Sequence, residues 1–89
     1  MIYTDSFLWD WRGKETICGH LFTDGNIEEL HEFAQKIGLK REWFQNKKLL
    51  KHYDLIGKKM IDKAVKAGAK LISLKEFMEI RKKINEVQE

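Results

Sequence analysis

The side chains best suited to ligand chemistry lie in the stretch from Arg41 to Asp54, as Trp43-Phe44-Gln45 and His52-Tyr53-Asp54. Aromatic rings stack on nucleobases with about 1–3 kcal/mol each, and basic side chains neutralise phosphate. The amide of Gln45 can donate and accept together, and so can read the edge of a base. A segment that joins two helices is usually small and polar. This density of large amphipathic side chains therefore indicates a binding surface.

The same aromatic residues have a structural alternative. Trp43 and Phe44 can plug the core beneath a long connector, with Tyr53 as a buried anchor. Trp9 and Trp11 carry the same ambiguity, because their alternation suggests that one is buried and the other exposed. The sequence leaves both interpretations open.

The three histidines, His20, His31 and His52, and the aspartates are the raw material for a metal or acid–base site. A metal needs three or four ligands that converge at about 2.0–2.2 Å with outer support. No His-x-x-x-His or Cys-x-x-Cys spacing occurs. We therefore expect these histidines to be structural or to hydrogen-bond a ligand, with no metal and no cofactor.

Nucleophilic catalysis has little support in the sequence. Cys18 lies within an apolar strand, where a thiol is usually an inert filler. Ser6 and Ser73 are better explained as a loop residue and a helix cap, and the isolated glycines form no phosphate-binding loop. The sequence indicates a binding protein more than an enzyme.

The charge is unevenly distributed along the chain, although the net charge is only +3. Residues 1–34 carry two basic and seven acidic side chains, whereas residues 35–75 carry twelve basic and three acidic ones. The aromatic stretch lies inside this cationic segment, which attracts phosphates. The plainer alternative is a solvated, lysine-rich surface.

The 89 residues predict one α/β domain, residues 1–89, with a small core. Three Trp and five Phe beside such a core favour self-association into a homo-oligomer. The single cysteine fits a reducing compartment. There is no signal-peptide pattern and no apolar run of roughly 20 residues. We expect a cytoplasmic protein that makes no membrane contact.

The first half of the chain predicts a strand over residues 1–4 that ends at Asp5, an irregular loop over 6–14, and a second strand over 16–22. Along that second strand His20 and Cys18 share one face, and Leu21 shares the other with Gly19. A helix then begins at Asn26 and ends at Gly38.

The second half predicts a helix capped by Asp54, a short strand over 70–72, and a helix that begins with the capping box of Ser73 and Glu76. A helix, strand and helix in sequence resemble half of a parallel α/β unit. We expect a short, mostly parallel sheet packed by about three helices, with the first and last strands adjacent. Ligands of such sheets lie beyond the strand carboxyl ends, which would place Asp5 near a site.

Several motifs together resemble the bacterial and phage domain-of-unknown-function family 4031. The resemblance covers residues 1 to about 73 and rests on these segments: Met1-Ile2-Tyr3-Thr4-Asp5, Trp11-Arg12-Gly13, Gly19-His20-Leu21, Glu29-Leu30-His31-Glu32-Phe33-Ala34, Trp43-Phe44-Gln45, His52-Tyr53-Asp54 and Ala67-Gly68-Ala69. Two positions depart from the family pattern: Gly19 replaces a serine, and Lys40 stands where proline is common. The resemblance implies that the polar residues of the template form one pocket, and the occurrence of relatives in phages leaves room for a role in blocking host defence.

We therefore expect a binding protein for a small phosphorylated ligand, a nucleotide or nucleotide-derived signal, which a phage can use as a sponge to sequester an immune signal. The alternatives are a nucleic-acid-binding protein that uses the basic aromatic segment, and a metal-dependent phosphodiesterase or nuclease. The expected ligand-binding residues are Asp5, Trp11, Arg12, His20, His31, Arg41, Trp43, Gln45, His52, Tyr53 and Asp54.

Overall fold

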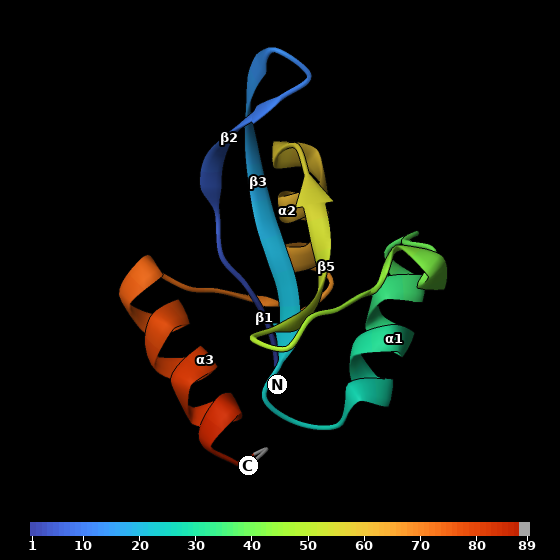
Figure 1. Cartoon of the computed structure of the whole chain (residues 1–89). Helices are drawn as coiled ribbons and strands as arrows, with labels where there is room; N and C mark the ends of the chain where they lie inside the picture. The colour runs from blue at the N-terminus through green and yellow to red at the C-terminus, as the bar shows by residue number, and fades with distance from the viewer. Residues whose placement is uncertain (88–89) are drawn as a thin grey trace.

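The computed structural model describes residues 1–87, which form a mixed β-sheet and three α-helices (Figure 1). The strands pair in the order β4-β5-β3-β1-β6, and β2 pairs with the other half of β3. The elements in chain order are β1 (Ile2–Thr4), β2 (Phe7–Trp11), β3 (Lys14–Thr23), α1 (Ile27–Lys36), the 3₁₀ turn η1 (Arg41–Trp43), β4 (Gln45–Asn46), β5 (Lys51–Ile56), α2 (Lys58–Lys66), β6 (Lys70–Leu71) and α3 (Leu74–Val87).

The small α/β domain with three helices is confirmed, but the expectation of a mostly parallel sheet is wrong. β3 pairs antiparallel with β1, β2 and β5, and β4 pairs antiparallel with β5. Within the described residues only the pairing of β1 with β6 is parallel, and it places the first and last strands side by side as expected. The sheet is mainly antiparallel because hairpins join β2 to β3 and β4 to β5, and because β3 runs antiparallel beside both β1 and β5.

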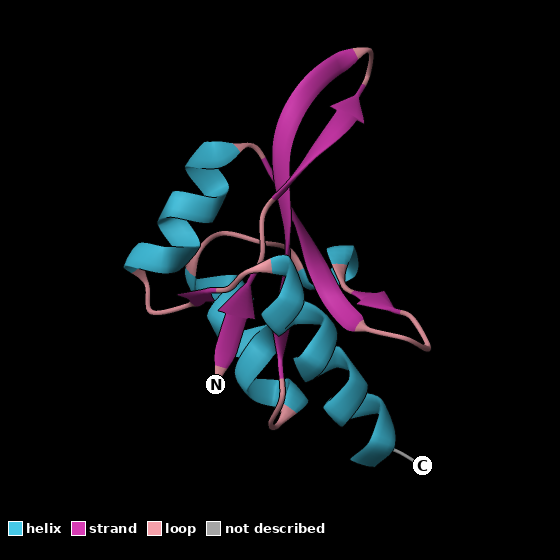
Figure 2. Cartoon of the chain, turned by 90° about the vertical axis from the view of Figure 1, so that its left-hand side faces the viewer, coloured by secondary structure: helices cyan, strands magenta, loops and turns pink. Residues whose placement is uncertain are grey.

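The predicted loop over residues 6–14 is instead half of a β-hairpin. Trp11 pairs with Lys14, so Arg12 and Gly13 form a two-residue turn, and both have positive φ, 53° and 79°. Positive φ at both central positions is typical of the type I′ turn that suits the twist of a hairpin. The hairpin projects well beyond the rest of the molecule (Figures 1 and 2).

Asp54 does not cap the second helix. It lies within β5, and α2 begins after Gly57, whose φ is 92°. Side chains from His52 to Ile56 point alternately to the two faces of the sheet. This strand pattern, rather than the capping potential of Asp54, decides the local structure. The other two helix starts are confirmed: the Asn26 side chain accepts from the backbone N–H of Glu28 at 2.9 Å, and Ser73 Oγ accepts from the backbone N–H of Glu76 at 3.2 Å.

The helices cover opposite faces of the sheet, because neighbouring residues of a strand point in opposite directions. Leu21 and Leu55 pack with α1 and α2, and Phe22 packs with Phe77 of α3. In Figure 1, β3 runs between α3 on one side and α1 on the other. No helix of the described chain has the length and apolar character to cross a membrane.

Candidate functional site

A cavity of about 520 Å³ opens on the α3 side of the sheet, between the β2–β3 hairpin, β5 and the start of α3. This volume falls within the usual range for small-molecule sites. Its walls are largely apolar and aromatic, and a few polar groups converge on it. We call it the hairpin pocket; it is lined by Asp5, Ser6, Phe7, Trp9, Trp11, Cys18, Gly19, His20, Gln45, His52, Asp54, Ile56, Leu74 and Phe77.

Strand register explains why these side chains face one another. Cys18 lies opposite Phe7 on one side and opposite Ile56 on the other, and directly paired residues share a face of the sheet. His20 is paired with Asp54 in the same way, one alternation further along β3. Residues two apart on a strand also share a face, so the register assembles one wall from β2, β3 and β5.

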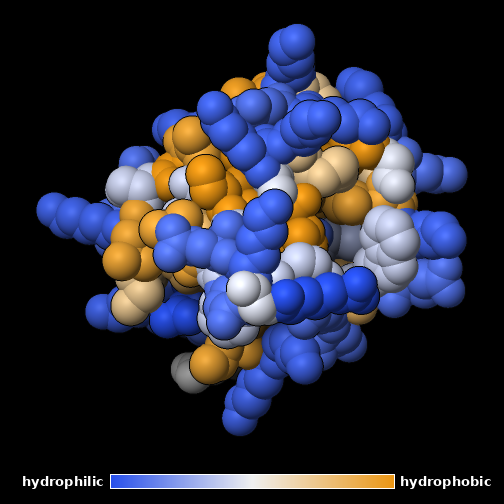
Figure 3. Space-filling view, turned by 90° about the horizontal axis from the view of Figure 1, so that it is seen from above, coloured by the Kyte–Doolittle hydropathy of each residue, from blue (hydrophilic) through white to orange (hydrophobic). Residues whose placement is uncertain are grey.

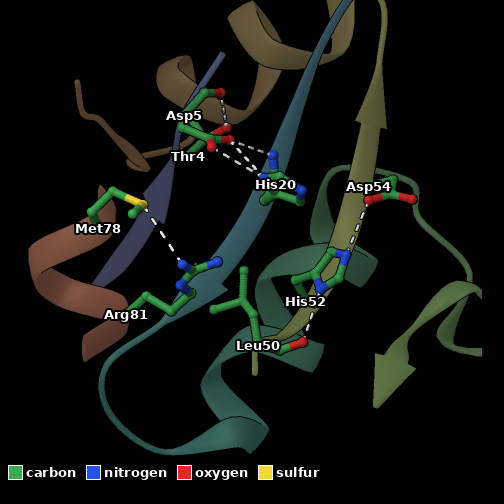
Figure 4. Close-up of polar contacts among 8 residues, drawn as sticks. All are labelled: Thr4, Asp5, His20, Leu50, His52, Asp54, Met78 and Arg81. Carbon is green, nitrogen blue, oxygen red and sulfur yellow. Dashed lines mark hydrogen bonds and ion pairs between the residues drawn. The ribbon is translucent and has the colours of Figure 1, made fainter. Parts of the chain in front are cut away.

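His20 is held firmly at the bottom of the hairpin pocket. Its backbone N–H donates to Asp5 Oδ1 at 2.6 Å, and its ring Nδ1 lies 3.1 Å from Asp5 Oδ2 (Figure 4). Its ring is stacked between Phe7 and Phe77, at centroid distances of 4.9 Å and 5.4 Å. Asp5 itself is buried and lines this pocket.

Gly19 allows Asp5 to come this close. A Cβ at Gly19 would lie 2.3 Å from the Asp5 carbonyl oxygen and 3.0 Å from Thr4 Oγ1. Any side chain there would push β3 away from the segment that joins β1 to β2. Gly19 therefore has a packing function in this chain.

His52 and Asp54 stand on the same face of β5 and approach each other, with His52 Nε2 3.1 Å from Asp54 Oδ1 (Figure 4). The Nδ1–H of His52 donates to the carbonyl oxygen of Leu50 at 3.0 Å. Gln45, on the adjacent β4, donates its Nε2–H to Asp54 Oδ2. His52 is buried, whereas 42% of the Asp54 side chain is exposed, so the carboxylate faces the opening.

A second hollow of about 740 Å³ adjoins the hairpin pocket along the part of β5 that pairs with β3 but not with β4. The two share Trp11, Gln45, Asp54 and Ile56, and the second adds Arg12 and others from the far side of β5, namely Gly38, Leu39, Trp43 and Met60. Figure 3, which looks down on the hairpin end, shows hydrophobic residues exposed between polar ones on this side of the molecule.

The structure brings six of the predicted binding residues into the hairpin pocket: Asp5, Trp11, His20, Gln45, His52 and Asp54. Arg12 and Trp43 line the adjoining hollow. Their side chains each belong to a cation–aromatic pair, Arg12 over Trp11 and Lys40 over Trp43.

The three remaining predicted residues lie elsewhere. Tyr53 is buried on the α1 side of the sheet, where its hydroxyl is 2.7 Å from Nδ1 of His31. Burial raises the pKa of Tyr53 above its ordinary value, and the nearby Arg41 only partly offsets this. Arg41 is exposed and forms an ion pair with Glu28 at 3.5 Å. Of the three histidines, only His20 and His52 share a cavity.

Several pocket residues are absent from the predicted set, chiefly Phe7, Trp9 and Phe77. The alternation of Phe7, Trp9 and Trp11 is the signal that reveals a strand with one aromatic face. Both tryptophans are exposed, by 58% for Trp9 and 41% for Trp11, so the expectation that one is buried is wrong. Phe77 belongs to a distant helix, and no local pattern assigns it to this site.

Two kinds of chemistry fit this arrangement. The aromatic wall can stack on a planar ring, and Gln45 and Asp54 can hydrogen-bond its edge. His20, His52 and Asp54 also present one ligand atom each within 4.8 Å of one another, the composition of a metal centre. No lysine or arginine is among the residues that line the hairpin pocket in the described chain.

The chain was compared with known families, curated proteins and solved structures. The family described as "Protein of unknown function (DUF4031)" matches residues 2–84, which include every residue of the hairpin pocket. No curated protein and no solved structure matches the chain.

Proposed function

We propose that this chain, which belongs to the DUF4031 family, binds a small nucleotide-type ligand in the hairpin pocket. The observation that carries the proposal is the convergence of exposed aromatic rings and polar edge-reading groups on one cavity of about 520 Å³. Ligand pockets of this kind combine apolar walls with a few directed polar groups.

The base of the ligand would lie against the aromatic wall. Trp9 and Trp11 are large, rigid and exposed. Apolar ring surface left in water does not stabilise the fold, so these rings are available to stack on a ligand. Each stacking contact contributes about 1–3 kcal/mol and is tolerant of base identity. Gln45 and Asp54 stand beside these rings and supply the donors and acceptors that distinguish one base from another.

The phosphate part of the ligand would extend toward the adjoining hollow, where Arg12 lies. Residues 35–75 carry nine more positive than negative charges, which raises the local concentration of anionic ligands. This arrangement differs from the one expected from the sequence, in which Trp43, Phe44 or Tyr53 stacks on the base and Arg41 with nearby lysines holds phosphate. Tyr53 is buried on the other face of the sheet, so the rings that would stack on the base are those of Trp9 and Trp11 in the hairpin.

A thermal-shift screen followed by calorimetry would test the proposal, with mononucleotides, cyclic nucleotides and ADP-ribose as probes, each with and without divalent cations. We expect at least one probe to raise the Tm of the wild type and of Leu8→Ala, but not of Trp9→Ala. Leu8 is the matched control because it is as exposed as Trp9 and adjacent to it, but faces the other side of β2. A folded sample that responds to none of the probes contradicts the proposal.

Metal-dependent phosphodiester cleavage is a second candidate function, favoured by the grouping of His20, His52 and Asp54. The two functions differ in the fate of the ligand. A binding or sequestering protein returns the nucleotide unchanged when the complex is denatured, whereas a phosphodiesterase returns a cleaved product. Chromatography of the released ligand after long incubation with Mn²⁺ or Zn²⁺ separates them.

A further inference from the structure

We infer that His20, His52 and Asp54 form a binding site for a divalent transition-metal ion at the base of the hairpin pocket. Their ligand atoms lie within 4.8 Å of one another, and His52 Nε2 is already 3.1 Å from Asp54 Oδ1. Ligands bound at about 2.0–2.2 Å in tetrahedral geometry are roughly 3.3–3.5 Å apart. Small side-chain rotations are therefore enough to close the site.

The sheet fixes the backbone of all three residues. His20 and Asp54 are a cross-strand pair, and His52 precedes Asp54 by one alternation on the same strand and face. Sites built on paired strands hold their side chains more rigidly than sites built on loops.

Each of the three candidate ligands is oriented by an outer partner. Nδ1 of His20 faces the buried carboxylate of Asp5, Nδ1–H of His52 donates to the Leu50 carbonyl, and Asp54 accepts from Gln45. Metal-binding histidines typically donate their second N–H to a carboxylate or a backbone carbonyl in this way. In both imidazoles Nε2 is therefore the nitrogen available to bind a metal ion.

The hydrogen bond of His52 gives a further reason for a cation here. The Leu50 carbonyl can only accept, so the proton of a neutral His52 is on Nδ1 and its Nε2 carries a lone pair. That lone pair faces a carboxylate oxygen, also rich in electrons, at 3.1 Å. An ion bound to both atoms removes the repulsion. The competing arrangement is a metal-free, doubly protonated His52 paired with Asp54.

Two imidazoles and one carboxylate suit Zn²⁺ and neighbouring first-row dications, whereas Mg²⁺ and Ca²⁺ prefer oxygen ligands. Asp54 is exposed at the pocket side, so a fourth position would open toward the aromatic wall. There the ion would receive a donor atom of the ligand and supply the positive charge that the residues lining this pocket lack. This last role rests on the proposed nucleotide binding, but the metal site itself does not.

Metal binding can be measured without any nucleotide. Untagged protein freed of metal with EDTA would be titrated with ZnCl₂ in competition with a chromophoric chelator. We expect one ion per chain, at least tenfold weaker binding by Asp54→Asn and by His20→Gln, and unchanged binding by His31→Gln, the histidine on the other face. Asp54→Asn is the more informative variant, because its partly exposed side chain keeps its size.

A second measurement separates a metal site from a proton-sharing network. Long-range ¹H–¹⁵N NMR of the imidazoles should show Nε2 of His20 and His52 shifted by Zn²⁺ while Nδ1 stays protonated. The inference is overturned if the wild type binds no stoichiometric Zn²⁺, or if Asp54→Asn and His20→Gln bind it as the wild type does. Stoichiometric Zn²⁺ without any nucleotide response would support the metal site and contradict only the proposed function.

Discussion

His20 and Asp54 face each other across β3 and β5 as a directly paired couple, although they lie in different halves of the sequence. Each also has an independent anchor, because His20 is held by Asp5 and Asp54 accepts from Gln45. β3 and β5, which are not consecutive in the chain, thus contribute to one polar cluster. The antiparallel sheet is what makes this pocket, since its register decides which side chains meet.

The close approach of Asp5 to β3 makes Gly19 the most sensitive glycine of the site. Replacing it with alanine places a Cβ 2.3 Å from the Asp5 carbonyl oxygen, so backbone must move. We expect Gly19→Ala to lower the free energy of unfolding by about 1–3 kcal/mol, the usual cost of overpacking. Urea denaturation followed by circular dichroism measures it.

Gly25→Ala is the control for that substitution. A Cβ at Gly25 would come no closer than 3.4 Å, to the mobile end of the Glu29 side chain. It should change the stability by less than about 1 kcal/mol. Equal losses in the two variants would show that the contact between Asp5 and Gly19 is not tight in solution.

Local signals predicted much of the fold. The cap at Asn26 and the capping box of Ser73 and Glu76 mark the starts of α1 and α3, because those hydrogen bonds form between neighbours in sequence. The hairpin also has a local signal, a two-residue turn at Arg12-Gly13 between alternating residues. The expectation of a loop over residues 6–14 is wrong because this alternation is that of a strand, Phe7–Trp11.

The sheet direction and the composition of the site could not be predicted in the same way. The local sequence around Asp54 fits a helix cap and a strand residue equally well. Its pairing with His20 decides that it is a strand residue. Because neighbouring residues of β5 point to opposite faces, the same pairing places Tyr53 on the other face of the sheet, where it contacts His31. A shift of one residue in register would exchange the two faces, so long-range pairing, not local sequence, decides which histidines share a cavity.

Both tyrosines should ionise later than a free tyrosine. Burial raises the pKa of Tyr53 above 10.0, and burial together with the hydrogen bond to Asp24 raises that of Tyr3. The folded state therefore holds tyrosyl protons that the unfolded chain releases, and the stabilisation present below pH 10 is lost as the pH rises through the folded pKa. Absorbance of tyrosinate at 295 nm follows the ionisation directly.

In the Tyr3→Phe variant the absorbance reports Tyr53 alone, since the chain has two tyrosines. We expect a midpoint above 10.0 while circular dichroism at the same pH still shows a folded protein. A midpoint at or below that value in the folded variant would mean that Tyr53 is more accessible than its position beneath α1 indicates.

Phe77 joins α3 to the site, so its removal should affect stability and pocket together. Its side chain is buried, stacks on His20 at 5.4 Å, and meets Phe22 edge-on at 5.5 Å. Phe77→Ala leaves a cavity between the helix and the sheet, and we expect a loss of about 3 kcal/mol. Met78→Ala, at the exposed neighbouring position, should cost less than about 0.5 kcal/mol.

The effect of Phe77 on the pocket can be separated from its effect on stability. Phe77→Leu keeps much of the apolar volume but loses the flat ring, so it should retain most of the stability and still change the environment of the His20 ring. The ring proton shifts of His20 in NMR spectra measure that change, because an aromatic ring stacked on the imidazole displaces them. If those shifts are the same in Phe77→Leu and in the wild type, the stacking does not persist in solution, and α3 covers the pocket without contacting His20.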